Sequence, residues 1–411
     1  MSLTANHKSS NPPRTLVALG NTADIRTWSN IPYFLFKAAN PIGFLTNTVD
    51  TTHPHYRYRS LAYTLLSPFR LEGPGGYQLS RDWSRRMWER IPESLRGGEF
   101  LSHFQLFPPL ELARQSGARH SFYCDATYKQ LLSARWPHMA RNVCGARTVA
   151  DAFARERELY QSARFFIGMA RATVQSAIND YGVDPRMAFV VRAGANLDES
   201  IVNSYLARRG PSWREAGEPF SQERPARLGF IGRDHGRKGL PRLIEAAEIL
   251  HSRGRAVRVT VIGNCPEQFQ SHPQVEWRGV IQKTTHMLEF IEAIDTFAIG
   301  CLPSYSEPLG ISTLEALRLG IPVMGTNVGG IPDCVPDDAG FLLPVDITGE
   351  GIASAIESNV FNPDQYDRLQ RAAKTHMNSV TWAGAVEKLV RIWQGVAHNC
   401  LVPSPGTPGE G

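Results

Sequence analysis

Two glutamates in the segment SYSEPLGISTLEALRLG, residues 304–320, stand among side chains that are mostly apolar or small. Pro308 suits the first turn of a helix, so we expect a helix over residues 309–319. Glu307 then lies just before the helix, and with about 100° of turn per residue Glu315 falls on its apolar face. A carboxylate can accept hydrogen bonds from hydroxyl groups, and a buried one needs a partner.

Two interpretations of these glutamates are open at this point. In the structural interpretation, Glu315 pairs with Arg318 one turn later for roughly a few tenths of a kcal/mol, and Glu307 only favours the helix dipole. In the functional interpretation, both carboxylates bind hydroxyl groups of a ligand. The spacing alone does not decide between them.

A basic loop, residues 234–239 with the sequence DHGRKG, follows an apolar run that ends at Gly232. Arg233, Arg237 and Lys238 cluster where the N–H groups of a helix start also point outward, which is typical of an anion site. The loop is not GxGxxG, which disfavours a nicotinamide or flavin cofactor, and Lys and Arg suit a diphosphate. A surface loop that is merely rich in arginine is the alternative.

Taken together, the two segments predict a site for a nucleotide sugar. Glu307 would accept hydrogen bonds from the sugar, and Glu315, further along the helix, would accept them from ribose hydroxyls. The backbone N–H groups at the helix start would donate to the phosphates, and they belong to Leu309, Gly310 and Ile311. The base is expected near the segment after the run VEW, at Arg278, Gly279 and Val280.

The elements that position these residues follow the same pattern in both halves of the chain. Short apolar runs alternate with helical spacing, which predicts parallel, doubly wound sheets. The runs that predict strands in the first half are residues 14–20, 100–107, 120–126, 163–170 and 188–194. Those of the second half are residues 227–233, 258–263, 293–304, 321–326 and 340–344, with an amphipathic helix over 240–254. The loops after four of these strands, at Gly232, Gly263, Cys301 and Gly325, should converge, because ligands bind beyond the carboxyl ends of such strands.

A polar stretch rich in Pro and Gly separates the two halves. The expected fold class is therefore α/β, with two Rossmann-like domains facing a central cleft that holds the active site. The expected boundaries are a flexible N-terminus at 1–13, an acceptor domain at 14–205, a linker at 206–225, a nucleotide-sugar domain at 226–380, a C-terminal helix at 381–398 and a disordered tail at 399–411. We expect the two domains to close on each other when the donor binds.

Composition excludes several other classes of protein. The chain has 411 residues, of which 44 are basic and 39 acidic, so the net charge of +5 does not indicate a nucleic-acid binder. The 6 cysteines are far apart and without CxxC pairs, which indicates reduced thiols and a cytoplasmic location. Neither HExxH nor Asp-x-Asp occurs, so no metal site is expected, and no apolar run is long enough to span a membrane.

One basic segment, Arg81 to Arg90, has two interpretations. Its apolar residues Trp83 and Met87 are four residues apart, with arginines largely on the other side, which suits contact with an anionic membrane surface. An ordinary surface helix packed on its own domain has the same pattern, and we favour that interpretation.

The second half of the chain resembles the family 4 glycosyltransferases of GT-B fold. Their two glutamates separated by seven residues match Glu307 and Glu315, and the similarity extends over residues 304–333. Their phosphate-binding pattern GR…KG is matched by Gly232, Arg233, Lys238 and Gly239. The resemblance is strong from about residue 227 to 344.

The first half resembles the same family at three places. TWSNIPYFL, residues 27–35, is similar to a loop that contacts substrate, which implies this role for Ser29 and Asn30, although Gly is usual at the second position. HSFYCDATY, residues 120–128, resembles the segment that presents a polar residue to the acceptor, here Asp125. Residues 379–396 resemble the last helix of the family, which crosses back to the first domain.

The resemblance implies transfer of a sugar from a nucleoside diphosphate sugar to a hydroxyl acceptor with retention of configuration. Arg233 and Lys238 would stabilise the leaving diphosphate, so no metal ion or other cofactor is required. The implied partners are the donor, with UDP or GDP as its nucleotide, and a glycan or lipid-linked acceptor, with peripheral contact to the inner membrane surface as a further option. A sugar-nucleotide epimerase and a non-catalytic carbohydrate-binding relative are the alternatives.

Overall fold

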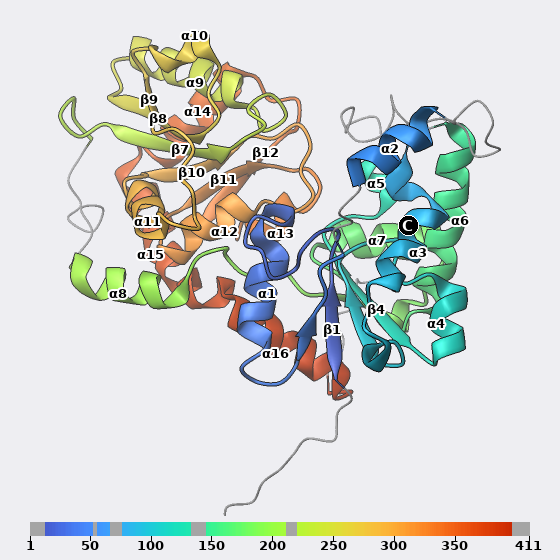
Figure 1. Cartoon of the computed structure of the whole chain (residues 1–411). Helices are drawn as coiled ribbons and strands as arrows, with labels where there is room; N and C mark the ends of the chain where they lie inside the picture. Colours follow the sequence, from blue (N-terminus) through green and yellow to red (C-terminus); the bar gives the residue numbers. More distant parts are fainter. Residues whose placement is uncertain (1–12, 52–55, 66–75, 133–144, 211–219, 397–411) are drawn as a thin grey trace, which may run out of the picture. The chain divides into compact units, whose positions relative to one another are not determined.

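The computed structural model describes residues 13–51, 56–65, 76–132, 145–210 and 220–396. The expected N-terminal segment up to residue 12 and the expected tail at 399–411 lie outside these ranges. The described residues form two parallel six-stranded sheets with helices between the strands (Figure 1). The α/β class and the two Rossmann-like domains are confirmed, whereas the cleft between them stays a prediction.

The first sheet has the strand order β2-β1-β3-β4-β5-β6. Its strands are short and overlap the runs expected from the sequence, apart from β2, which was not expected. They are β1 (Arg14–Val17), β2 (Asn47–Thr48), β3 (Glu99–Ser102), β4 (Arg119–Cys124), β5 (Phe166–Gly168) and β6 (Ala188–Val190). The pairings of β1 with β2 and β3, and of β3 with β4, are parallel.

The second sheet has the order β12-β11-β10-β7-β8-β9, and its pairings are all parallel. Its strands are β7 (Ala226–Gly232), β8 (Val257–Gly263), β9 (Val275–Trp277), β10 (Ile299–Leu302), β11 (Val323–Thr326) and β12 (Gly340–Leu343). From β7 the chain moves outward to β8 and β9, then returns to place β10 on the other side of β7. In such sheets ligands bind where the order reverses, at the carboxyl ends of β7 and β10.

The helices of the first half are α1 (Ile31–Ala39), α2 (Tyr56–Leu65), α3 (Arg81–Glu89), α4 (Leu110–Ser116), α5 (Tyr128–Leu131), α6 (Ala146–Ser162) and α7 (Arg171–Tyr181). Those that follow are α8 (Glu199–Arg209), α9 (Leu240–Ser252), α10 (Glu267–Gln270), α11 (Met287–Asp295), α12 (Ile311–Arg318), α13 (Ile331–Cys334), α14 (Gly349–Asn359), α15 (Pro363–His376) and α16 (Trp382–Trp393). The described residues also form short 3₁₀ turns at residues 28–30, 77–79, 93–95, 185–187 and 377–380. No described helix is long and apolar enough to cross a membrane.

The chain divides into two compact units. The first comprises residues 1–124, 140–167 and 181–187, and the second comprises residues 125–139, 168–180 and 188–411. Helix α8 continues to Arg209, so the first four residues of the expected linker, 206–209, are helical. The other domain boundaries stay predictions.

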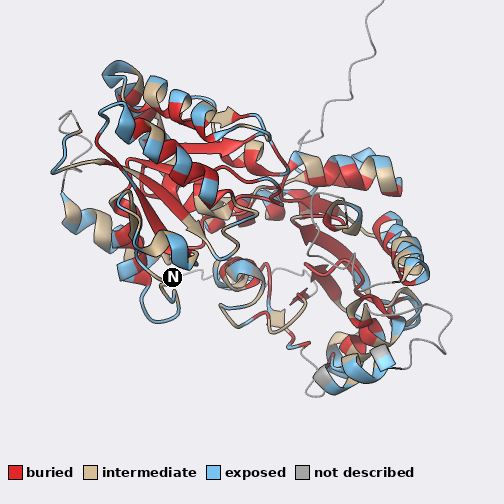
Figure 2. Ribbon diagram, turned by 90° about the horizontal axis from the view of Figure 1, so that it is seen from above, coloured by how far each residue is buried: buried red, intermediate tan, exposed pale blue. Residues whose placement is uncertain are grey.

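The second unit carries the candidate site on a well-buried sheet. Helices α9 and α14 cover one face of this sheet, and α11, α12 and α15 lie on the other (Figure 1). The strands are buried, while the outward faces of the helices are exposed (Figure 2). The amphipathic helix expected over 240–254 is confirmed as α9, whose apolar residues pack on the sheet. Such a core fixes the strand ends, and therefore the loops that leave them.

Two expectations about local structure were wrong. Residues 104–107 are buried but form no strand, because β3 already ends at Ser102 and the side chain of that serine donates to the carbonyl of Phe104. The apolar character of this run reflects burial, which periodicity alone does not distinguish from a strand. The helix expected from residue 309 begins at Ile311, because Gly310 has φ 106°, in the left-handed region that a helix excludes.

Helix α3 packs on its own unit, as the favoured interpretation of the basic segment had it. Its apolar residues Trp83, Met87 and Trp88 are buried. On its outer side Arg81 forms an ion pair with Asp151 of α6, at 2.7 Å. The face that would enter a membrane is therefore inside the protein.

Candidate functional site

The basic loop after β7 is shaped by two glycines. The stem of Lys238 passes over Gly232, where an added Cβ would lie 2.5 Å from Lys238 Cδ. Gly239 has φ +77°, and an added Cβ there would lie 1.9 Å from the carbonyl oxygen of Pro303. Only glycine permits both approaches, so the loop after β7 lies directly against the loop after β10.

The loop after β10 holds Glu307 from both sides. Tyr305 N–H donates to the carbonyl of Arg237, which joins this loop to the one after β7. On the other side Gly330 N–H donates to the carbonyl of Glu307, and an added Cβ at Gly329 would lie 1.8 Å from that oxygen. The backbone of Glu307 is therefore fixed before any ligand binds.

The carboxylate of Glu307 is buried and paired with two cations. Its Oε2 lies 3.0 Å from Arg237 Nη1 and 3.3 Å from Lys238 Nζ, while Ser304 Oγ donates to it at 3.5 Å. Burial acts to raise the pKa of Glu307, but Lys238 and Arg237 outweigh it and hold the pKa below its ordinary value. The interpretation in which Glu307 only favours the helix dipole is therefore wrong. Glu307 Oε1 accepts no hydrogen bond from the described residues.

The three cations of the loop differ in their surroundings. Lys238 pairs with Glu307, and its charge also acts to lower the pKa of Glu315. Arg237 forms an ion pair with Glu307 and donates to the carbonyl of Ser306 at 2.6 Å. The one sequence signal for this role was its position next to Lys238. Arg233 is exposed and has no ion-pair partner in the part of the chain that the structure describes. It remains available to an anion.

The start of α12 carries backbone N–H groups that no described residue accepts. Leu309 and Gly310 precede the helix, and Ile311 is its first residue. None of these three N–H groups donates to an acceptor among the described residues, as expected at a helix start. The two-residue shift of the helix leaves all three as candidate phosphate ligands.

Glu315 is buried on α12, but the expected ion pair with Arg318 was wrong. Lys283, from the loop before α11, pairs with Glu315 Oε1. Arg318 instead binds Glu199 of α8, with Nη2 2.6 Å from Oε2. Burial raises the pKa of Glu315 although Lys283 acts in the opposite direction. No sequence signal could have found Lys283, which lies 32 positions away in another loop.

The segment expected near the base lies beside the ends of β7 and β8. Gly279 has φ +71°, and its carbonyl accepts from Gly263 N–H, while Gly263 packs on Gly232. Arg278 is exposed and forms an ion pair with Glu276 at 2.5 Å, and Val280 is exposed next to it. The loops after Gly232 and Gly263 therefore meet as predicted, whereas contact with a base stays a prediction.

The candidate residues of the first half lie in two separate loops. Ser29 and Asn30 have φ 55° and 71°, and Asn30 caps α1 in the left-handed conformation. Asparagine tolerates this conformation better than most residues, which explains how it stands where glycine is usual. Asp125 follows β4, and its carbonyl accepts from Thr173 Oγ1 at 2.6 Å. Their roles stay predictions.

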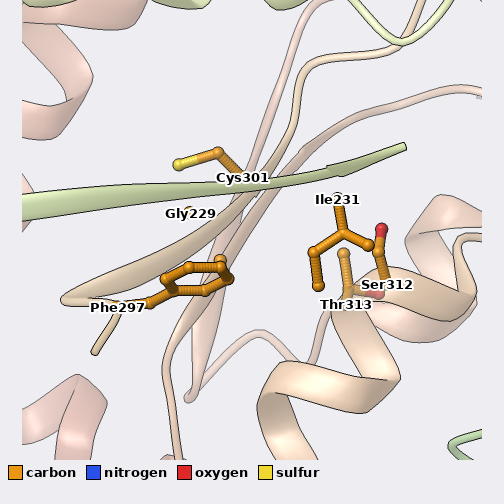
Figure 3. A pocket seen from close by; sticks show the side chains of 7 residues that line it. Gly229, Ile231, Phe297, Cys301, Ser312 and Thr313 are labelled. Atoms are coloured by element: carbon orange, nitrogen blue, oxygen red, sulfur yellow. The ribbon is translucent and has the colours of Figure 1, made fainter. Parts of the chain in front are cut away.

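A small recess lies beside the first turn of α12, lined by residues of β7, β10 and α12 and by Phe297, which precedes β10 (Figure 3). The ring of Phe297 fills the space over Gly229, where an added Cβ would lie 1.9 Å from it. The recess has no room for a water molecule, so it is a feature of core packing. Among the described residues, no group of three or more His, Cys, Asp or Glu could hold a metal ion.

The chain is similar to known glycosyltransferases in sequence. Residues 212–376 match the family model described as glycosyl transferases group 1. The chain is 26% identical over 250 residues to a D-inositol 3-phosphate glycosyltransferase of Nocardia farcinica, covering 57% of this chain and 53% of the relative. It is 27% identical over 306 residues to the protein of that name in Corynebacterium jeikeium, covering 69% and 70%. The chain thus spans about half the length of the Nocardia relative.

Solved structures resemble this one over almost its whole length. The Anabaena protein Alr3699/HepE, solved in complex with UDP, has a TM-score of 0.61 at 14% identity and covers 93% of this chain and 100% of its own. At this identity the similarity concerns the fold.

Proposed function

Because the chain belongs to the glycosyl transferases group 1 and has the GT-B fold, we propose that it transfers a hexosyl residue from a nucleoside diphosphate sugar to a hydroxyl acceptor, with retention of configuration. The product would be a glycan, a surface polysaccharide or a glycolipid. The observation that carries the proposal is the position of Glu307, held by Arg237 and Lys238 where the strand order of the second sheet reverses.

The second unit would bind the donor by its charges. Arg233, Lys238 and the N–H groups before α12 would bind the diphosphate and stabilise the negative charge that develops on it as the sugar departs. Because these groups are already fixed in the protein, little free energy is needed to arrange them during the reaction. In this scheme the cations replace a metal ion, so chelation with EDTA should leave turnover unchanged.

Glu307 would act at the sugar. Its Oε2 keeps Arg237 and Lys238 in place, and its Oε1 would accept hydrogen bonds from sugar hydroxyls beside the bond that breaks. Glu315 would accept from ribose hydroxyls. Both roles need ionised carboxylates, which accept but do not donate.

Asp125 is our candidate for contact with the acceptor hydroxyl, and Ser29 and Asn30 for contact with the sugar or acceptor. A glycan and a lipid-linked sugar both fit this proposal. Peripheral contact with a membrane surface would have to use exposed arginines of α3, because its apolar residues are buried.

The first experiment is a panel of nucleotide sugars, with UDP and GDP donors tested first, in which nucleotide release and product stereochemistry are measured. A transferase releases nucleotide in the presence of an acceptor, and a retaining one preserves the anomeric configuration. An epimerase would change the sugar but release little nucleotide, and a binding module would do neither. Either of these last results would overturn the proposal.

A further inference from the structure

The carboxylate of Glu315 is buried, and its partner Lys283 is largely buried. The side chain of Glu315 is 2% exposed and that of Lys283 is 14% exposed. Lys283 belongs to the loop between β9 and α11, close to the segment expected at the base. Since a buried carboxylate without a partner is costly, the fold must keep Lys283 in place.

Three contacts fix the ammonium group of Lys283. Besides Glu315, it donates to the carbonyl of Asn196 at 3.3 Å, and it lies 4.4 Å from the centroid of the Phe290 ring. Two of its three N–H donors are thus directed at oxygens, and the ring offers its negative face to the charge. This is more organisation than a surface ion pair has.

Lys283 and Lys238 are the cations whose charge acts on Glu315. Lys283 comes from the loop before α11, and Lys238 comes from the loop after β7 and also serves Glu307. The one basic residue of α12, Arg318, is bound to Glu199 of α8. Removing Lys283 would therefore leave Glu315 buried with only the more distant Lys238.

We propose that Lys283 is a positioning residue for nucleotide binding, which fixes the charge and the orientation of the Glu315 carboxylate so that it accepts hydrogen bonds from the two ribose hydroxyls of a nucleoside diphosphate. The inference rests on the proposed function, which gives Glu315 this ligand. Lys283 itself need not touch the nucleotide, because it acts through Glu315.

The protonation state of Glu315 links Lys283 to the pH dependence of ribose binding. Burial raises the pKa of Glu315 even with Lys283 present. Because Lys283 acts to lower this pKa, removing Lys283 should raise it further. A protonated carboxyl has lost acceptor capacity toward hydroxyl groups. Without Lys283 the contribution of the ribose should be weak at low pH and should return as pH rises and Glu315 ionises.

The test measures binding by calorimetry to the full-length chain. UDP, GDP and ADP are screened first, and the tightest is compared with its 2′,3′-dideoxy analogue at pH 6 to 9. In the parent, the ribose form should bind tighter than the dideoxy form throughout. In Lys283→Met the ribose form should lose about tenfold or more at pH 6, the scale of a hydrogen bond to a charged group, while the dideoxy form loses little.

Two further variants distinguish a positioning role of Lys283 from a general loss of structure. Lys283→Arg keeps the charge and should restore much of the preference for ribose. Arg318→Met breaks another ion pair of the same helix without touching Glu315, and it should leave the preference for ribose unchanged. Melting temperatures show which variants are folded.

The outcomes distinguish this inference from the function it rests on. Equal losses of the ribose and dideoxy forms in Lys283→Met, or a pH dependence identical to that of the parent, overturn the positioning role alone. If the folded parent binds none of the three nucleotides, the proposed donor site is wrong and the inference falls with it.

Discussion

At the scale of single residues, Glu307 is the side chain with the clearest expected effect. Glu307→Gln keeps the shape but removes the charge at the sugar, so turnover should fall by roughly 10²-fold or more, the scale of one preorganised electrostatic contact. Affinity for a nucleoside diphosphate should be kept or increased, because Arg237 and Lys238 are then free to bind phosphate. Steady-state kinetics and calorimetry measure both. Turnover equal to that of the parent would show that Glu307 is only structural.

The same variant should have a pH signature in its stability. The folded-state pKa of Glu307 lies below its ordinary value of 4.5, so its ion pairs stabilise the fold above that pH, and this contribution is lost as pH falls through the lower, folded pKa. Glu307→Gln should therefore cost about 1 to 3 kcal/mol at pH 7 and progressively less in acid. Urea unfolding from pH 7 down to pH 3 measures the difference. A cost that is constant over this range would contradict it.

Arg233 and Lys238 should differ in a way that sequence did not indicate. Replacing either by Ala should weaken diphosphate binding much more than nucleoside binding, since each change removes a charge-assisted contact worth about 1.5 to 3 kcal/mol. Lys238→Ala should also destabilise the protein, because it leaves Glu307 with one cation fewer, whereas exposed Arg233 should not. Calorimetry with diphosphate and nucleoside, together with melting curves, tests both points. Equal losses for the two ligands would mean that phosphate binds elsewhere.

At the scale of elements, Gly239 joins the loops after β7 and β10. Gly239→Ala should cost clearly more than the roughly 1 kcal/mol expected for a positive φ, because its Cβ would collide with the carbonyl oxygen of Pro303. Gly254 is a matched control, with the same φ of +77° and nothing within 4 Å of an added Cβ. Urea unfolding of both alanine variants isolates the collision. Equal costs would show that the two loops are not in close contact.

The same scale shows what the sequence could predict. The strands of the second sheet and the glycines at their ends were predictable, because apolar runs that stop at Gly232 or Gly263 carry local signals. The start of α12 was not, because a glycine can adopt both helical and left-handed φ, so its residue type alone does not reveal the φ of 106° at Gly310.

Ion pairs between elements were beyond local patterns altogether. Spacing suggested Glu315 with Arg318, yet each binds a residue of another element, because a fold brings together loops that are far apart in sequence. The cation that pairs with Glu315 must reach a buried position in the fold. A buried carboxylate needs a cation that lies equally far from the surface, and the spacing of residues in the sequence does not show this distance.

At the scale of the whole molecule, the proposed donor residues from Gly232 to Glu315 all belong to the second unit, whereas Ser29 and Asn30 belong to the first. A transfer that uses both sets requires the units to come together around the donor. We therefore expect the radius of gyration from small-angle scattering to decrease when a nucleotide sugar is added. Lys238→Ala, measured at the same donor concentration, is the control, because it should bind too little donor to respond. An unchanged profile of the parent at saturating donor, with binding verified by calorimetry, would contradict this closure of the two units.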